Sequence, residues 1–249
     1  IRDRYHVLEE KGREPQYDGY VESFTENWEK LERYDNNAPK TMNAHLHVLE
    51  AYTLLYQCWK DNGLKKRLEF CVDLFINRIY DPSRKHFNLF FDNEWNSLVE
   101  MDSYGHDVET GWLLCEAART LENQDLIEQT NQLALDVTEA CLAEGMSDKG
   151  YMIYEKKGDR KTKHASWWGQ IETVIACVNA WQISGSDVYL QSVDTVWTFV
   201  KDHMVDKEYG EWYSDCFDGE PKKEAPKVSM WRCPYHTVRL GVEMYNRLK

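Results

Sequence analysis

The sequence predicts an all-α protein built from helical hairpins that repeat at a nearly constant interval. Joints typical of one helix ending and the next beginning recur about 61 residues apart, at Asp61-Asn62-Gly63, Glu122-Asn123-Gln124 and Ser184-Gly185-Ser186. Asn and Gly suit the end of a helix, and Asn or Ser can cap the start of the next. Hairpins of fixed period stack into an open solenoid or a closed (α/α) toroid, in which we expect each first helix to be inner and each second helix outer.

The chain is too short to complete such a toroid. A ring of six hairpins needs roughly 360 residues at this period, and the 249 residues here hold about four hairpins. No Pro/Ser-rich linker or low-complexity tract divides them, so we expect residues 1–249 to form one incomplete (α/α) domain. Because the sequence begins with Ile1 rather than Met, we expect it to start inside a longer gene product.

Within each repeat the same elements follow in order. The first helices are expected to begin near residues 42, 103, 167 and 231, each with one apolar face; in the third, Trp168, Ile171, Ile175 and Val178 recur at steps of 3, 4 and 3. Short segments rich in Gly, aromatic residues and turn formers precede these helices, namely YDGYVESF, FNLFFDNEW, GYMIYEKKGD and YGEWYSDCF. Their alternating aromatic residues predict brief strands or long ordered loops.

Charge and composition argue against several classes of function. A formal net charge of -13 disfavours binding to nucleic acids or to anionic membranes, and no run of roughly 18 apolar residues predicts a membrane span. The start of the chain lacks the apolar core of a signal peptide. The seven cysteines form no Cys-x-x-Cys pair. This indicates buried free thiols in a reducing compartment, so the cytoplasm is the expected location.

Candidate functional residues recur at the beginning of each first helix. In MNAHLHVLEAY, Asn43 and His47 are four apart and share a face of the predicted helix, whereas His45 points elsewhere. The later helices carry the candidates His106, Glu109, Trp112, Trp168, Glu172, Trp231, His236 and Arg239. We expect the four helices to direct these side chains into a common pocket at one end of the ring. The remaining histidines are expected to be surface or capping residues: His6, His86, His164 and His203.

Histidines on opposite sides of a pocket suit proton transfer to and from carbon. Imidazole titrates near neutral pH, so one ring can remove a proton beside a carbonyl, as at C2 of an open-chain aldose, while another returns a proton on the opposite face. Glu109 and Glu172 could orient the imidazoles or bind hydroxyls, and tryptophans could stack on sugar rings. Two other chemistries stay open. They are glycoside hydrolysis by the two glutamates and a metal site of His106, Glu109 and another histidine, although HDVE is not His-Glu-x-x-His.

A family resemblance rests on four stretches of the sequence: KTMNAHLHVLEAY, SYGHDVETGWLL, WWGQIE and RCPYH. They are similar to segments of the N-acylglucosamine 2-epimerase superfamily, and the Cys-Pro-Tyr-His form favours its disaccharide branch, the cellobiose 2-epimerases. The resemblance implies an (α/α)6 barrel, of which this chain is the C-terminal two-thirds. It also implies reversible, cofactor-free and metal-free epimerisation at C2 of the reducing-end sugar in β-1,4-linked disaccharides such as cellobiose, lactose or mannobiose.

The same resemblance implies roles for the candidate residues. Ring opening is followed by proton abstraction, a cis-enediolate and reprotonation on the other face, with His106 and His236 as the proton-transferring pair. His47 assists near the ring oxygen or the carbonyl, with Asn43 beside it. The implied binding residues are Glu109 and Glu172 for hydroxyls and histidines, Trp168 and Trp231 as walls around the sugar, and also Trp112 and Arg239.

The sequence departs from the family pattern in two places. Thr237 and Val238 stand where the family tail CPYHNGR has Asn and Gly, next to His236. The family's first helices are absent, including an Arg that polarises the carbonyl, so the isolated fragment is expected to be inactive or poorly folded. The alternatives are an aldose–ketose isomerase, an N-acetylglucosamine 2-epimerase and, without catalysis, a carbohydrate-binding toroid. The expected partner is a small saccharide, and the expected state is a monomer or weak dimer.

Overall fold

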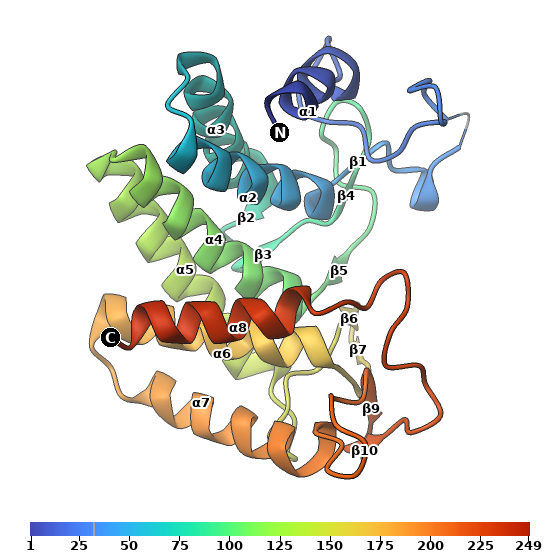
Figure 1. Cartoon of the computed structure of the whole chain (residues 1–249), viewed down its shortest axis with the longest axis vertical. Helices are drawn as coiled ribbons and strands as arrows, with labels where there is room; N and C mark the ends of the chain where they lie inside the picture. Colours follow the sequence, from blue (N-terminus) through green and yellow to red (C-terminus); the bar gives the residue numbers. More distant parts are fainter. Residues whose placement is uncertain (32) are drawn as a thin grey trace. The chain divides into compact units, whose positions relative to one another are not determined.

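The computed structural model describes residues 1–31 and 33–249, and more than half of these residues lie in helices, which loops and short strands connect (Figure 1). The chain divides into two compact units. Unit 1 comprises Ile1–Met101 and Glu116–Gln124, and unit 2 comprises Asp102–Cys115 and Asp125–Lys249. The expectation of one domain over residues 1–249 stays a prediction.

Unit 1 is built around the hairpin of α2 and α3. Its elements are α1 (Arg2–Val7), a π-helical turn (Leu8–Gly12), a 3-10 turn (Asp35–Asn37), β1 (Lys40–Thr41), α2 (Met42–Cys58), α3 (Asn62–Leu74), a second π-helical turn (Phe75–Ile79), β2 (Tyr80–Asp81), β3 (His86–Phe87) and β4 (Phe90–Phe91). β1 pairs with β4 and β2 pairs with β3, both antiparallel. Asp61 caps α3 by accepting from the N–H groups of Gly63 and Leu64. The first predicted joint is therefore confirmed.

Unit 2 contains further helical hairpins and a last helix. Its elements are β5 (Met101–Asp102, at the boundary with unit 1), α4 (Tyr104–Leu121, whose last turns belong to unit 1), α5 (Gln124–Gly145), β6 (Lys156–Lys157), β7 (Arg160–Lys161), β8 (His164–Ser166), α6 (Trp167–Ser184), α7 (Val188–Phe199), a π-helical turn (Val200–Met204), β9 (Asp215–Phe217), β10 (Glu220–Pro221) and α8 (Tyr235–Arg247). β6 pairs with β7, and the order β10-β9-β8 forms an antiparallel sheet. The joints predicted at 122–124 and 184–186 both separate helices. At the second, Gly185 ends α6 with φ 71°, which glycine adopts without steric cost.

The core of unit 2 lies around α6. Every residue from Trp168 to Ala180 is buried, whereas α7 buries only Tyr189, Val196 and Phe199. A helix that is buried on all sides lies inside a fold, and a helix with one apolar face lies on its surface. This difference is the one expected between the inner and the outer helix of a hairpin.

The aromatic segments between the helices form the brief strands and loops that the sequence predicts. FNLFFDNEW contains β4, and YGEWYSDCF ends in β9, while YDGYVESF is tied to its neighbours by isolated bridges such as Arg13 to Tyr20. His86 was expected at the surface, and that expectation is wrong. Its side chain is buried, as is that of Phe87, the other residue of β3. In the described part of the chain, no helix is both long enough and apolar enough to cross a membrane.

Candidate active site

The first turn of α8 brings His236 against a buried glutamate of α6. Nδ1 of His236 lies 2.7 Å from Oε1 of Glu172, and the glutamate side chain is fully buried. A carboxylate can only accept, so Nδ1–H of His236 is the donor. The neutral ring then carries its lone pair on Nε2, which is the nitrogen able to take up a proton.

A single guanidinium compensates two buried carboxylates at this site. Nη1 of Arg239 donates to Oε1 of Glu109 at 2.5 Å and to Oε1 of Glu172 at 3.0 Å. Trp112 Nε1 donates to the other oxygen of Glu172 at 2.9 Å, and the Arg239 guanidinium lies 4.2 Å from the centre of the Tyr235 ring. Removing one partner of such a buried network typically costs about 3–5 kcal/mol. Its geometry therefore fixes the position of Glu172 and, through it, the ring of His236.

Trp168 joins His236 to the second expected histidine of unit 2. Its ring stacks on His236 at 5.6 Å and 28°, and it lies 4.6 Å from His106 at 51°. Nδ1 of His106 is 2.8 Å from the Ser103 hydroxyl. Two imidazoles from different helices thus contact one indole, which brings two groups able to exchange protons to one place in unit 2.

A glycine beside His106 allows Trp168 to lie this close to α4. A Cβ atom added to Gly105 would lie 2.7 Å from Cζ3 of Trp168, well inside van der Waals contact. Ser166, at the start of α6, accepts from the Gly169 N–H and caps the helix that carries the tryptophan. The position of the indole is therefore set by the backbone of two helices.

Glu109, Glu172 and His236 also have the donor types of a metal site. One ligand atom from each lies within 4.8 Å of the other two. However, Arg239 already donates to both carboxylates, and a cation here would have to displace or repel the guanidinium. The donor set therefore does not fit a metal as it stands, and the expectation of a metal-free enzyme stays a prediction.

The other expected residues are less tightly placed. Trp231 lies in the loop before α8 with 82% of its surface exposed, so its role as a wall opposite Trp168 stays a prediction. Asn43 and His47 belong to unit 1 on α2; His47 is exposed and approaches Glu50 at 3.4 Å. Their membership of the site also stays a prediction. His45 does point into the interior of unit 1, away from the exposed side chain of His47.

Sequence reasoning missed a row of contacting side chains that runs from Trp168 through Tyr154 and His164 to Asp215. Tyr154 meets Trp168 edge-on at 5.9 Å and lies 4.8 Å from His164, whose Nε2 is 2.5 Å from Oδ1 of Asp215. Burial raises the pKa of Tyr154. Burial also acts to raise the pKa of Asp215, but hydrogen bonds from His164 and Ser214 outweigh it and hold that pKa below its usual value. His164 was taken for a surface or capping residue, and no local signal corrects that, because its partner is 51 residues away.

The sequence matches the model of a known family over nearly its whole length. The family is N-acylglucosamine 2-epimerase (GlcNAc 2-epimerase), and the match covers residues 1–239. The cellobiose 2-epimerase of Bacteroides fragilis is 40% identical over 236 residues, which are 91% of this chain and 59% of that relative. The cellobiose 2-epimerase of Dictyoglomus turgidum is 36% identical, over 92% of this chain and 60% of its own. The chain thus spans about three-fifths of the length of these relatives.

A solved structure extends the likeness to the fold. The cellobiose 2-epimerase from Bacillus thermoamylovorans B4167 superposes with a TM-score of 0.94 at 34% identity, covering 99% of this chain and 64% of that one. This confirms the predicted fold class, an (α/α) barrel of helical hairpins present in part. On the evidence of the family match and of these relatives, the chain belongs to the N-acylglucosamine 2-epimerase family.

Proposed function

We propose that the protein to which these residues belong catalyses reversible epimerisation at C2 of the reducing-end sugar of β-1,4-linked disaccharides, the class of cellobiose, lactose and mannobiose. Family membership and the names of its relatives support an epimerase acting on such sugars. The observation that carries the chemistry is the contact of His106 and His236 with the same indole, that of Trp168.

The proposed reaction needs one proton to leave C2 and one to return. After ring opening, the C2 hydrogen is acidic because the enolate delocalises onto the C1 carbonyl oxygen. One imidazole removes it and leaves a cis-enediolate, and the other imidazole delivers a proton to the opposite face of C2. No electrons are exchanged with a further reactant, and the two rings exchange roles in the reverse direction. This sequence requires an acid and a base of similar pKa, which two histidines provide.

The hydrogen bonds of the two rings suit these roles. His236 donates from Nδ1 to Glu172, so its Nε2 is the base, and the carboxylate stabilises the imidazolium that forms. His106 acts as the acid in its imidazolium form, in which Nδ1–H donates to the Ser103 hydroxyl oxygen and Nε2–H delivers the proton, leaving a neutral ring. Opposite protonation states of the two rings are what transfer across one carbon demands.

The remaining expected residues take supporting roles in the proposal. Arg239 compensates the charges of Glu109 and Glu172, while Trp168 and Trp231 form apolar walls for the sugar. His47, with Asn43 beside it, assists at the ring oxygen or carbonyl. We assign stabilisation of the negative charge on the enediolate oxygen to residues in the part of the family domain that this chain does not include. Removal of one hydrogen-bond donor to such an oxyanion typically lowers kcat by about 10²–10³-fold.

Isotope exchange tests the proposed mechanism directly. The gene's whole product is incubated with cellobiose in D2O, and deuterium at C2 is followed by NMR in both epimers. We expect label at C2 in substrate and product as equilibrium is approached. Epimerisation without label would rule out the enediolate. A ketose as the main product would identify an aldose–ketose isomerase, and turnover of N-acetylglucosamine but not cellobiose would identify the N-acetylhexosamine branch.

A binding protein without catalysis is the alternative from another class. His236→Ala should leave sugar binding largely intact in either case, because Trp168 and Glu109 remain. If the wild type turns over the sugar and His236→Ala does not, the proposal of an enzyme is supported. Binding without turnover in the wild-type whole product would favour the carbohydrate-binding toroid.

We also propose a cytoplasmic location and a monomeric or weakly dimeric state. Cys71, Cys115, Cys141, Cys177 and Cys216 are buried free thiols, and burial raises the pKa of Cys71 to about 12. Such thiols are unreactive and need no oxidising compartment.

A further inference from the structure

Arg232 is a buried cation in the segment that joins β10 to α8 (Figure 1). Only 3% of its surface is exposed. Its ion pair with Glu211 is long, with 3.6 Å between Nη2 and Oε1, and 47% of the Glu211 side chain is exposed. A guanidinium removed from water is costly unless its N–H groups find acceptors. The contacts that compensate Arg232 therefore indicate which parts of the chain it holds together.

Two main-chain carbonyls accept hydrogen bonds from this guanidinium. Nη1 of Arg232 donates to the Lys227 carbonyl, and Nη2 donates to the Trp212 carbonyl at 2.6 Å. Nε is buried and has no hydrogen-bond partner among the described residues. The central carbon of the guanidinium lies 5.1 Å from the centre of the Trp167 ring, within the range of a cation–π contact. Arg232 thus joins its own segment to two others.

The ring of Trp167 belongs to the start of α6. The Trp167 N–H donates to the Ser214 carbonyl at 3.0 Å, and β8 pairs with β9 immediately before this residue. Trp168, one of the proposed walls for the sugar, is the next residue of the helix. When Arg232 packs on Trp167, it therefore contacts the frame that positions Trp168.

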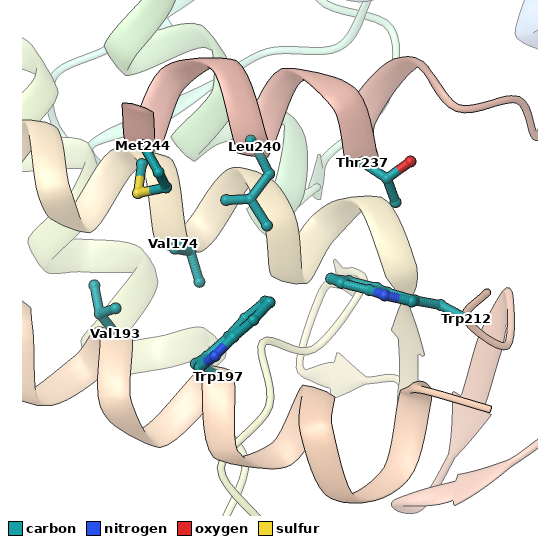
Figure 2. A pocket seen from close by; sticks show the side chains of 8 residues that line it. Val174, Val193, Trp197, Trp212, Thr237, Leu240 and Met244 are labelled. Atoms are coloured by element: carbon teal, nitrogen blue, oxygen red, sulfur yellow. The ribbon is translucent and has the colours of Figure 1, made fainter. Parts of the chain in front are cut away.

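The carbonyl of Trp212 belongs to a residue that lies beneath α8. Trp212 and Thr237 are among the residues that line a cavity of about 460 Å³, and the indole of Trp212 lies below the first turn of α8 (Figure 2). The same indole lies 5.9 Å from that of Trp197 on α7. Because its indole is placed between two helices, Trp212 offers Arg232 an acceptor in a fixed position.

The backbone of Arg232 closes the turn that presents Trp231. The Arg232 N–H donates to the Ser229 carbonyl at 3.2 Å, and the Ser229 N–H donates to the Arg232 carbonyl at 3.1 Å. The Ser229 hydroxyl also accepts from the N–H groups of Trp231 and Arg232, at 3.3 and 3.1 Å. Trp231 itself is 82% exposed, so the turn rather than side-chain packing determines where its indole lies.

We propose that Arg232 is a positioning residue for sugar binding, which holds Trp231 at a fixed distance from Trp168 so that both indoles can cover one sugar ring. The inference rests on the proposed function, in which these two tryptophans are the walls for the sugar. A ring contributes to binding only at contact distance, so a wall on a loosened turn binds the sugar weakly. His236 is held separately, by Glu172, so we expect the effect on KM rather than on kcat.

Substitutions of Arg232 in the gene's whole product test the proposal. Arg232→Met keeps the apolar stem and removes the donors, whereas Arg232→Lys keeps the charge and loses the planar fork. In Arg232→Met we expect KM and Kd for cellobiose to rise about fivefold to tenfold, with kcat changed less than about threefold, and in Arg232→Lys a smaller rise. Steady-state kinetics and calorimetric titration measure these constants. Arg160→Met, on the exposed strand β7, is the matched control and should change none of them.

A double-mutant cycle with Trp231 separates positioning from stability. Trp231→Ala should raise KM by a similar factor, and adding Arg232→Met to it should raise KM no further, because both substitutions remove the same wall. Lower thermal stability of Arg232→Met with wild-type KM and Kd would show a structural role alone and overturn the proposal. Effects on KM that multiply in the double variant would overturn it too.

A measurement without sugar distinguishes this inference from the proposed function. Labelling with fluorotryptophan gives Trp231 a fluorine NMR resonance, which is assigned by its loss in Trp231→Phe. Arg232→Met should shift that resonance, and Arg160→Met should leave it in place. A resonance that Arg232→Met leaves unmoved overturns the inference even if the wild type is an epimerase. A wild type that binds no cellobiose, while its Trp231 resonance responds to Arg232→Met, contradicts the proposed function and the role in sugar binding but not the anchoring of the turn.

Discussion

His45 in unit 1 and His236 in unit 2 stand on the first turns of two helices, yet their surroundings differ in one respect. Nε2 of His45 accepts from the Tyr20 N–H at 2.8 Å, and Nδ1 donates to the Thr41 carbonyl at 2.7 Å. In His236 only Nδ1 forms a hydrogen bond, to Glu172, and Nε2 makes no hydrogen bond to any described residue. A buried histidine with two neutral partners is structural, whereas one with a carboxylate on one nitrogen and an available second nitrogen can transfer protons.

Each ring also packs against a tryptophan that lies close to a glycine. The ring of Trp95 lies 4.9 Å from that of His45, and a Cβ atom on Gly19 would lie 2.4 Å from Cζ2 of Trp95. Trp168 lies 5.6 Å from His236 and meets Gly105 in the same way. The packing against a tryptophan is therefore shared, and the hydrogen-bond partners distinguish the two rings.

Replacing the two histidines should separate activity from stability. His236→Ala in the gene's whole product should lower kcat roughly 10²–10⁴-fold, the usual contribution of a general acid or base, with cellobiose binding retained. His45→Ala should leave kcat per folded molecule nearly unchanged. Steady-state kinetics and calorimetric titration measure both, and the exposed His203→Ala is the control. A loss of less than tenfold for His236→Ala would contradict its role as a base.

Removing the carboxylate partner should make His236 resemble His45. Glu172→Gln keeps an acceptor for Nδ1–H but loses the charge that stabilises the imidazolium. We expect kcat to fall by about 10²-fold, because the imidazolium that forms on His236 loses its neighbouring negative charge. Glu208→Gln, at the surface, should leave kcat unchanged. An unchanged kcat in Glu172→Gln would contradict the role of this carboxylate in stabilising the imidazolium.

The pH dependence of stability should reveal His45. Burial lowers its pKa from 6.5 to about 4, so the unfolded chain takes up a proton at a higher pH than the folded one. The contribution of neutral His45 to the free energy of unfolding is therefore complete above pH 6.5. It is lost as the pH falls toward 4, and the total loss is about 3 kcal/mol. Urea unfolding of the wild type and of His45→Gln across this pH range isolates the pH-dependent contribution of His45 to stability. Parallel curves for the two proteins would mean that His45 titrates normally when folded.

The sequence revealed the helices and the residue types of the site but not their contacts. Periodic apolar positions and helix-ending residues such as Gly185 are local signals, so the joints between the two helices of each hairpin could be predicted closely. The recurrence of His106 and His236 at helix starts predicted that they converge on one site. Both rings contact Trp168, and their common role in a site stays a prediction. The bridge from Arg239 to Glu109 joins residues 130 apart, and no periodicity encodes such a pairing.

Burial was the harder property to predict for single polar residues. His45 and His47 are two positions apart, yet one is fully buried and the other exposed, as helical phase predicts. His86 failed because it lies on a two-residue strand, too short to show alternation. His164 is partly exposed, and its hydrogen-bond partner Asp215 is brought to it by the pairing of β8 with β9. Where the environment is set by tertiary pairing, residue type and spacing are insufficient.

The two glycines give the finest separation of the two histidines. In Gly105→Ala the new methyl group must displace Trp168, because Cζ3 lies 2.7 Å away and the Cα atom of Gly169 only 3.2 Å away. Misplacing the indole that both rings of the proposed proton-transferring pair contact should lower kcat/KM by about tenfold or more. The loss of stability should be about 1–3 kcal/mol.

Gly19→Ala should do the opposite. Its φ of +94° is unfavourable for alanine, and the methyl group would also lie 2.9 Å from Nε2 of His45, so strain and overpacking each add about 1–3 kcal/mol. Gly111→Ala, on the same helix as Gly105, meets its nearest atom at an ordinary 3.5 Å and serves as the control for both. Steady-state kinetics and urea unfolding of the three variants show whether each substitution lowers activity or stability. If Gly105→Ala lost only stability and Gly19→Ala only activity, the assignment of one histidine to structure and the other to catalysis would have to be exchanged.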